Sequence, residues 1–145
     1  MQHTSHTDYY MLIESIIIAS AHLAQVSPAA LLSVCSVESN LISKINVQDY
    51  GSASYGPCQV KLATARLIDP STRPVKLWLD ASYSSLIAAR YLAKQLKRYH
   101  GNLHQAILAY NAGTFKGTKT SRTNREYLKR VLKRMEFYES AFITH

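Results

Sequence analysis

One carboxylate in this 145-residue chain has the surroundings that general acid catalysis requires. Glu38 lies at the end of a strongly apolar segment, LLSVCSVES, where an ionised carboxylate is costly to place. Burial raises the pKa of a carboxyl group, and a carboxyl that stays protonated near neutral pH can act as a general acid. We therefore expect Glu38 to be largely buried, to face a groove and to have a raised pKa. Because most glutamates are solvated, the alternative is a helix-end residue turned towards water.

Two further clusters could supply the groups that bind a substrate. Residues 51–59 read GSASYGPCQ, in which small residues permit close approach and Ser, Tyr and Gln can bind hydroxyls and amides. An ordinary surface loop would explain Ser52 or Ser54 equally well. Residues 106–113 read AILAYNAG and place Tyr110 and Asn111 at the end of an apolar helix, where Tyr110 could also be a core residue.

Taken in order, these clusters resemble the soluble lytic transglycosylases, or SLT domains, which are relatives of goose-type lysozyme. That family shows Glu-Ser after an apolar helix, then Gly-Leu-Met-Gln, Ala-Tyr-Asn-Ala-Gly and a late Tyr-Val-x-x-Val. The matching segments here are Glu38-Ser39, Gly56-Pro57-Cys58-Gln59, Ala109-Tyr110-Asn111-Ala112-Gly113 and Tyr127-Leu128-Lys129-Arg130-Val131. Pro57 and Cys58 depart from the usual Leu-Met. The resemblance covers roughly residues 8–142.

The resemblance implies cleavage of the peptidoglycan bond between N-acetylmuramic acid and N-acetylglucosamine. Glu38 would act first as acid and then as base, and the product would be a 1,6-anhydro sugar. No metal and no cofactor would be needed. Besides Glu38, only Asp49 lies in the motif-bearing loops, and Asp49 reads better as a turn residue. The supporting or substrate-binding residues that the motifs imply are Ser39, Gln59, Tyr110, Asn111 and Tyr127.

Two other functions compete with this one. A goose-type muramidase would cleave the same bond by adding water. A basic binding module is the remoter alternative, since the net charge is +8 and eight of the seventeen Lys and Arg residues lie between Lys116 and Arg134. Such charge suits anionic partners, including nucleic acid and wall polymers. No nucleic-acid motif accompanies it, so we expect peptidoglycan strands and no nucleic acid as the partner.

The pattern of apolar residues and caps predicts a mainly α fold, and the resemblance implies the lysozyme-like (α+β) superfamily. It would form one compact helical domain over residues 1–145, with an active-site groove and at most a short β-hairpin. Ser27, Asp80 and Asn102 are expected N-caps, and Gly113 is an expected helix end. We expect a polar loop at 39–56 and a turn region at 69–74. The expected helices span 8–25, 28–38, 58–68, 81–99, 103–112 and 124–142.

The two cysteines and the N-terminus leave alternatives open. Cys35 precedes Glu38 by one helical turn and Cys58 belongs to the second motif, so the two should lie near each other if that motif lines the same groove. They would form either a disulfide or two buried thiols; a zinc site is not expected. We predict no transmembrane segment and see no clear signal peptide. Related domains act at the bacterial wall within secretion, conjugation, pilus or phage assemblies, either in the periplasm or delivered by a virion.

Overall fold

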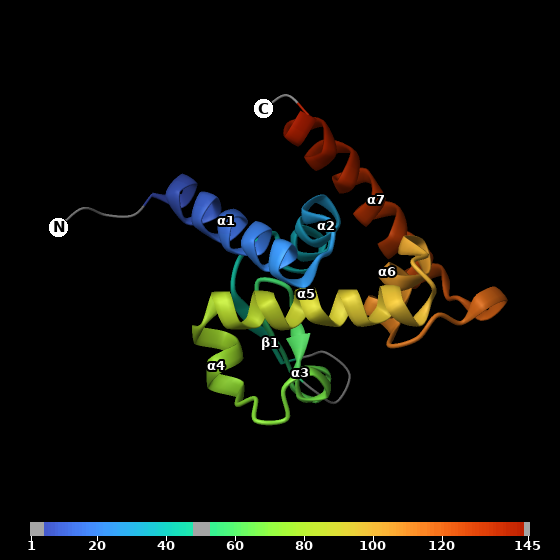
Figure 1. The fold of residues 1–145 in the computed structure, drawn as a ribbon, viewed down its shortest axis with the longest axis horizontal. Helices are drawn as coiled ribbons and strands as arrows, with labels where there is room; N and C mark the ends of the chain where they lie inside the picture. Colours follow the sequence, from blue (N-terminus) through green and yellow to red (C-terminus); the bar gives the residue numbers. More distant parts are fainter. Residues whose placement is uncertain (1–4, 48–52, 144–145) are drawn as a thin grey trace.

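The computed structural model describes residues 5–47 and 53–143, and seven α-helices dominate these ranges (Figure 1). The mainly α fold with a small sheet confirms the fold class expected from the sequence. In chain order the elements are α1 (His6–Ala24), α2 (Pro28–Ser39), β1 (Lys44–Asn46), β2 (Ser54–Gly56), β3 (Val60–Lys61), α3 (Leu62–Ile68), α4 (Pro74–Leu79), α5 (Ala81–Arg98), α6 (Leu103–Ala112), the 3₁₀ turn η1 (Gly117–Lys119) and α7 (Arg122–Ile143).

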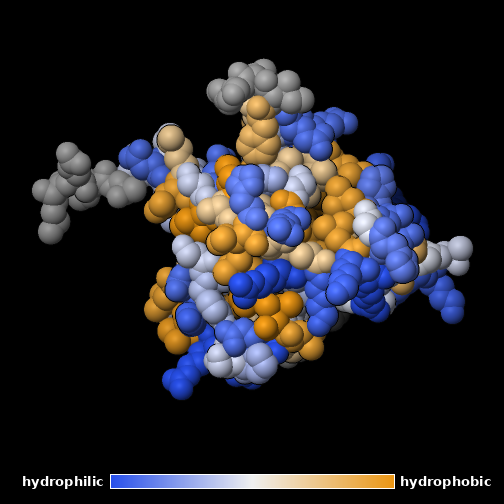
Figure 2. Space-filling model, in the orientation of Figure 1, coloured by the Kyte–Doolittle hydropathy of each residue, from blue (hydrophilic) through white to orange (hydrophobic). Residues whose placement is uncertain are grey.

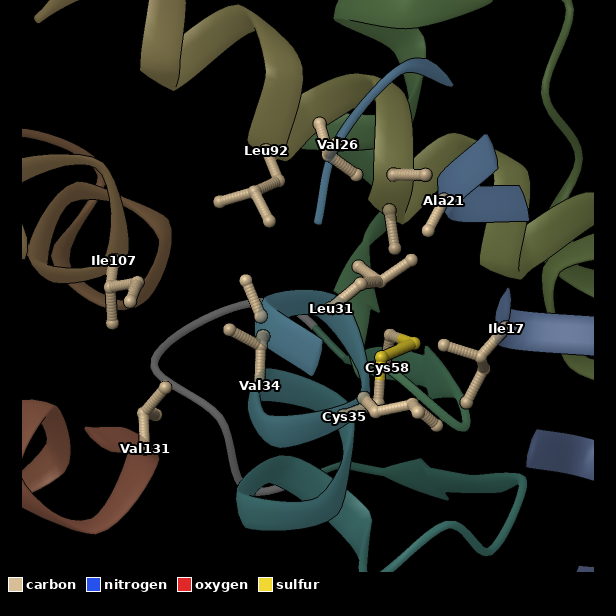
Figure 3. Close-up of a cluster of buried hydrophobic side chains, with 14 of the residues drawn as sticks. Ile17, Ala21, Val26, Leu31, Val34, Cys35, Cys58, Leu92, Ile107 and Val131 are labelled. Carbon is tan, nitrogen blue, oxygen red and sulfur yellow. A yellow bond between two sulfur atoms is a disulfide. The ribbon is translucent and has the colours of Figure 1, made fainter. Parts of the chain in front are cut away.

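Helix α2 is the centre of the fold. Every residue from Ala29 to Ser36 is buried, as expected for a helix that is apolar around most of its circumference. Helices α1 and α7 pack against α2, while α5 crosses the molecule and packs against α1 and α6 (Figure 1). Figure 3 shows side chains of these five helices meeting around Leu31 and Val34. The apolar helix that ends in Glu38 is therefore fixed from several sides.

The caps predicted from the sequence set the ends of the helices. The Ser27 side chain accepts a hydrogen bond from the Ala30 amide at 3.2 Å, with Pro28 in the first turn of α2. Asp80 caps α5 and Asn102 caps α6 in the same way. Gly113 ends α6 in the left-handed conformation, at φ 83°. These boundaries place Glu38 and Ser39 in the last turn of α2, and Tyr110 and Asn111 in the last turn of α6.

The sequence misjudged two segments. Residues 58–61 form a turn and strand β3 instead of the start of a helix, which gives an antiparallel β1–β2–β3 sheet with one strand more than a hairpin. Helix α4 begins at Pro74, inside the expected turn region; with six residues it is too short to show helical periodicity. Its Trp78 is 43% exposed and not a core residue. Asp49 and Ser52 lie outside the described residues.

The surface shows where polar side chains gather. On the face drawn in Figure 2, hydrophilic side chains cover the end of the molecule that carries α6 and the loop after it. Within residues 5–47 and 53–143, no helix combines the length and the apolar character that a membrane span needs. The end of α6 also borders the cavities described next.

Candidate active site

A cavity of about 200 Å³ lies at the end of α2. Glu38 is the only carboxylate among the described residues that line it. The other lining groups are phenols, uncharged polar side chains, one lysine and short apolar residues. They are supplied by the turn between β2 and β3, by β3, by α3, by α5 and by the end of α6: Gln59, Val60, Lys61, Thr64, Tyr91, Tyr110, Asn111, Ala112 and Gly113.

A second cavity, of about 320 Å³, lies on the other side of Glu38. Glu38 and Asn111 line both cavities and therefore stand between them. The remaining lining residues of the second cavity are Val37 of α2 together with Thr123, Glu126, Tyr127 and Arg130 of α7. The chain thus brings together Glu38, Gln59, Tyr110, Asn111 and Tyr127, as the motifs predicted. Glu38 faces the groove that these two cavities form. Its side chain is half-buried, less than the sequence led us to expect, and a raised pKa for its carboxyl stays a prediction.

The turn Gly56–Gln59 is fastened to the helix that carries Glu38. The Ser39 hydroxyl forms hydrogen bonds with the carbonyls of Cys35, at 3.2 Å, and Pro57. Cys35 and Cys58 form a disulfide that lies inside the core (Figure 3). The bridge that the sequence left open is therefore present. Ser39 is buried and lines neither cavity, so its hydroxyl joins two backbone segments at this site.

Gln59 presents one defined group to the first cavity. Its side chain is 8% exposed, and its Nε2 donates hydrogen bonds to the carbonyls of Lys44, at 3.0 Å, and Gly56, at 2.8 Å. An amide nitrogen carries two hydrogens, so both donors are used within the protein. The carbonyl oxygen of Gln59 is then the group that can accept a hydrogen bond from a ligand.

The two phenols next to Glu38 differ in their hydrogen bonds. Tyr110 donates to the carbonyl of Cys58 at 2.9 Å. The buried Tyr127 hydroxyl has no partner at ordinary hydrogen-bond geometry, although Glu38 lies near enough to act on it through a longer hydrogen bond. Burial, and then the charge of Glu38, raise the pKa of both phenols well above 10. Both therefore stay protonated, and Tyr127 is the one whose proton can turn towards Glu38.

Asn111 is held by a residue that the sequence did not single out. Asn124 of α7 is buried, and its Nδ2 donates to Asn111 Oδ1 at 2.9 Å and to the carbonyl of Leu108 at 3.2 Å. Asn124 heads the buried stripe of α7 that continues through Tyr127 and Val131. A polar residue at the head of an apolar stripe is the signal that could have identified it.

Other lining residues were also missed. Tyr91 stacks at a tilt on Tyr110, with ring centroids 5.3 Å apart, and in sequence it looks like any core tyrosine of an amphipathic helix. In the sequence, Glu126 and Arg130 look like solvent-exposed residues of a basic helix. Only their place beside Tyr127 puts them in the second cavity. No signal in the sequence distinguishes them.

A comparison with known families supplies the class of the protein. A family model described as "Transglycosylase SLT domain" matches residues 15–133, which is most of the chain and includes every motif residue named above. The groove is lined by residues of the motifs on which the resemblance rests. The chain therefore belongs to the SLT transglycosylase family, among the lytic transglycosylases and lysozyme-like enzymes that act on the peptidoglycan of the cell wall.

Proposed function

We propose that this chain is a lytic transglycosylase that cleaves the β-1,4 bond between N-acetylmuramic acid and N-acetylglucosamine. The observation that carries the proposal is that Glu38 is the single carboxylate among the described residues lining a cavity whose other walls are phenols, amides, one lysine and small residues. Glycosidases that use water or a protein nucleophile generally need two carboxylates across the bond. A cavity with one suits a reaction in which the substrate supplies the nucleophile.

The proposed reaction needs neither water nor a cofactor. Glu38 gives its proton to the bridging oxygen, and the bond from C1 of the muramic acid to that oxygen breaks. The neighbouring acetamido group stabilises the positive charge at C1. Ionised Glu38 then takes the proton of the C6 hydroxyl while O6 bonds to C1. Because O6 belongs to the same sugar, its effective concentration is high. The enzyme ends with Glu38 protonated, ready for another turnover.

The surrounding residues have distinct parts in this proposal. Tyr127 orients the Glu38 carboxyl through its hydroxyl, which stays protonated because burial and the nearby carboxylate raise its pKa. The Gln59 carbonyl oxygen and the Asn111 amide offer an acceptor and a donor to the sugar. Ser39 holds the turn Gly56–Gln59 against the end of α2, and Tyr110 holds it against the end of α6.

A muramidase is the second candidate, and one observation favours it. Glu126 lines the second cavity with Glu38, so a pair of carboxylates borders the groove on that side. In an inverting hydrolase the second carboxylate activates a water molecule. Glu126 is exposed, as a water-activating base can be. If Glu126 has this role, the products carry reducing ends and the activity depends on both glutamates.

The deciding experiment is digestion of purified cell-wall sacculi, with mass spectrometry of the soluble products. We expect products lighter by one water than hydrolytic ones. Glu38→Gln should lower the rate at least about a hundredfold without loss of folding, while Glu126→Gln and the remote control Glu139→Gln should keep it. Wild-type activity in Glu38→Gln would contradict the proposal. Reducing ends together with an inactive Glu126→Gln variant would establish the muramidase instead.

A further inference from the structure

Asn111 stands between the two cavities that flank Glu38, so the way its side-chain amide faces decides what the groove offers a substrate. An amide group has a donor end and an acceptor end of nearly the same shape. Packing alone therefore does not select one orientation. A hydrogen bond from a fixed partner does, because only the carbonyl end can accept it.

Asn124 is such a partner. Both hydrogens of its Nδ2 are donated, one to Asn111 Oδ1 at 2.9 Å and one to the carbonyl of Leu108 at 3.2 Å. Its side chain is 6% exposed, and its own backbone amide is capped by the Ser121 hydroxyl at 3.1 Å. Asn124 thus holds a fixed place in the first turn of α7 and bridges to the last turns of α6.

We infer that Asn124 is a positioning residue for the proposed reaction: it holds the Asn111 amide with its carbonyl towards α7 and its NH₂ towards the groove. The groove then presents a donor at Asn111 and an acceptor at the Gln59 carbonyl oxygen, both in the first cavity with Glu38. The ligand group that fits Asn111 is an oxygen acceptor of an N-acetylated sugar, of which the acetamido carbonyl is the strongest.

The direction of the hydrogen bond between Asn124 and Asn111 can be reversed by substitution. In Asn124→Asp the carboxylate cannot donate, but it can accept from Asn111 Nδ2, so Asn111 turns round and shows its oxygen to the groove. In Asn111→Asp the bond from Asn124 persists, and the second carboxylate oxygen faces the groove. Two different substitutions should therefore cause the same defect, an acceptor where the wild type has a donor.

The test rests on the proposed function and compares initial rates on solubilised glycan strands, both N-acetylated and chemically N-deacetylated. We expect Asn124→Asp and Asn111→Asp each to lower kcat/KM on N-acetylated strands at least about tenfold. Both should lose most of the preference for the acetylated substrate. Asn102→Asp is the matched control, since Asp caps α6 as well as Asn does and lies about 14 Å along the helix from Asn111. It should retain wild-type kinetics.

Stability measurements separate positioning from a merely structural role. Melting temperatures are recorded for every variant, and Asn124→Ala, which leaves Asn111 free to take either orientation, is added in case the aspartate disturbs Leu108. We expect folded variants with reduced kcat/KM. A folded Asn124 variant with wild-type kcat/KM and preference would overturn the inference, and so would failure of both Asn124 variants to fold at 25 °C. An inactive wild type would instead refute the proposed function.

Discussion

The Tyr110 hydroxyl donates its hydrogen bond to the backbone carbonyl of Cys58, at 2.9 Å, and so joins the end of α6 to the turn that carries Gln59. Its proton is engaged there and is not directed at Glu38. The Tyr127 hydroxyl, by contrast, lacks a partner of ordinary geometry and lies within reach of the carboxylate. Two tyrosines that looked equivalent in the sequence therefore differ in their hydrogen bonds.

The first prediction separates these tyrosines by single substitutions to phenylalanine. Tyr127→Phe should lower kcat about tenfold to a hundredfold, the equivalent of a hydrogen bond to a charged group. Its stability should stay near wild type, because the buried hydroxyl lacks a good partner. Tyr110→Phe should lower the free energy of unfolding by about 1 kcal/mol and affect kcat less. Urea unfolding and sacculus digestion measure both. The reverse ranking would assign the contact with Glu38 to Tyr110.

The second prediction concerns Gly56. Its φ is 82°, and a Cβ there would lie 2.7 Å from Ser84 Oγ and 3.1 Å from the Leu77 carbonyl. Gly101 has the same φ and nothing within 4 Å, so it is a matched control for the backbone term alone. Gly101→Ala should cost about 1–2 kcal/mol of unfolding free energy. Gly56→Ala should cost about 1–3 kcal/mol more and displace Gln59. Equal losses in the two variants would show that the contact with Ser84 relaxes freely.

The third prediction concerns the disulfide. Cys35 and Cys58 are 23 residues apart. In the chain-entropy model, removing a cross-link that closes a loop of this size lowers the free energy of unfolding by about 3 kcal/mol. The Cys35→Ala/Cys58→Ala variant should be destabilised by that amount and should cleave sacculi more slowly, because the turn bearing Gln59 is released. Unfolding by urea, followed with and without dithiothreitol, measures the loss. Unchanged stability in the double variant would exclude a structural role for the bond.

The fourth prediction is a loss of stability at alkaline pH. The pKa values of Tyr110 and Tyr127 lie well above 10 in the folded protein, whereas an unfolded tyrosine titrates near 10. Above about pH 10 the unfolded state binds fewer protons, so the unfolding free energy falls as pH rises towards the folded pKa values. Below pH 10 these phenols make no pH-dependent contribution. Urea titrations between pH 8 and 11 should show a shallower fall for Tyr110→Phe/Tyr127→Phe than for wild type.

Local signals predicted most of the helices because capping is a local interaction. Ser27, Asp80 and Asn102 each bind an amide three residues ahead, so their effect is visible in the sequence. Strand β3 and helix α4 were missed for the opposite reason. They contain two and six residues, too few to show a period, and they depend on packing against other elements: β3 pairs with β2, and α4 packs on β2 and α5.

The candidate site was predictable only where a motif carried it. Glu38, Gln59, Tyr110, Asn111 and Tyr127 lie in recognisable segments, and the chain brings them together. Asn124 donates a hydrogen bond to a side chain 13 positions away, and Glu126 enters the second cavity only because α7 packs on α2. The Cys35–Cys58 bond was left undecided because the sequence cannot distinguish a disulfide from two buried thiols.

That bond also bears on when the enzyme becomes active. Dithiols remain reduced in the cytoplasm and close in oxidising compartments such as the periplasm. Until closure, the turn bearing Gln59 would be joined to the end of α2 by hydrogen bonds alone, chiefly the one between Ser39 and Pro57. A chain with both thiols reduced would therefore have a loosened groove. Oxidation of Cys35 and Cys58 would tie the turn to α2 and complete it.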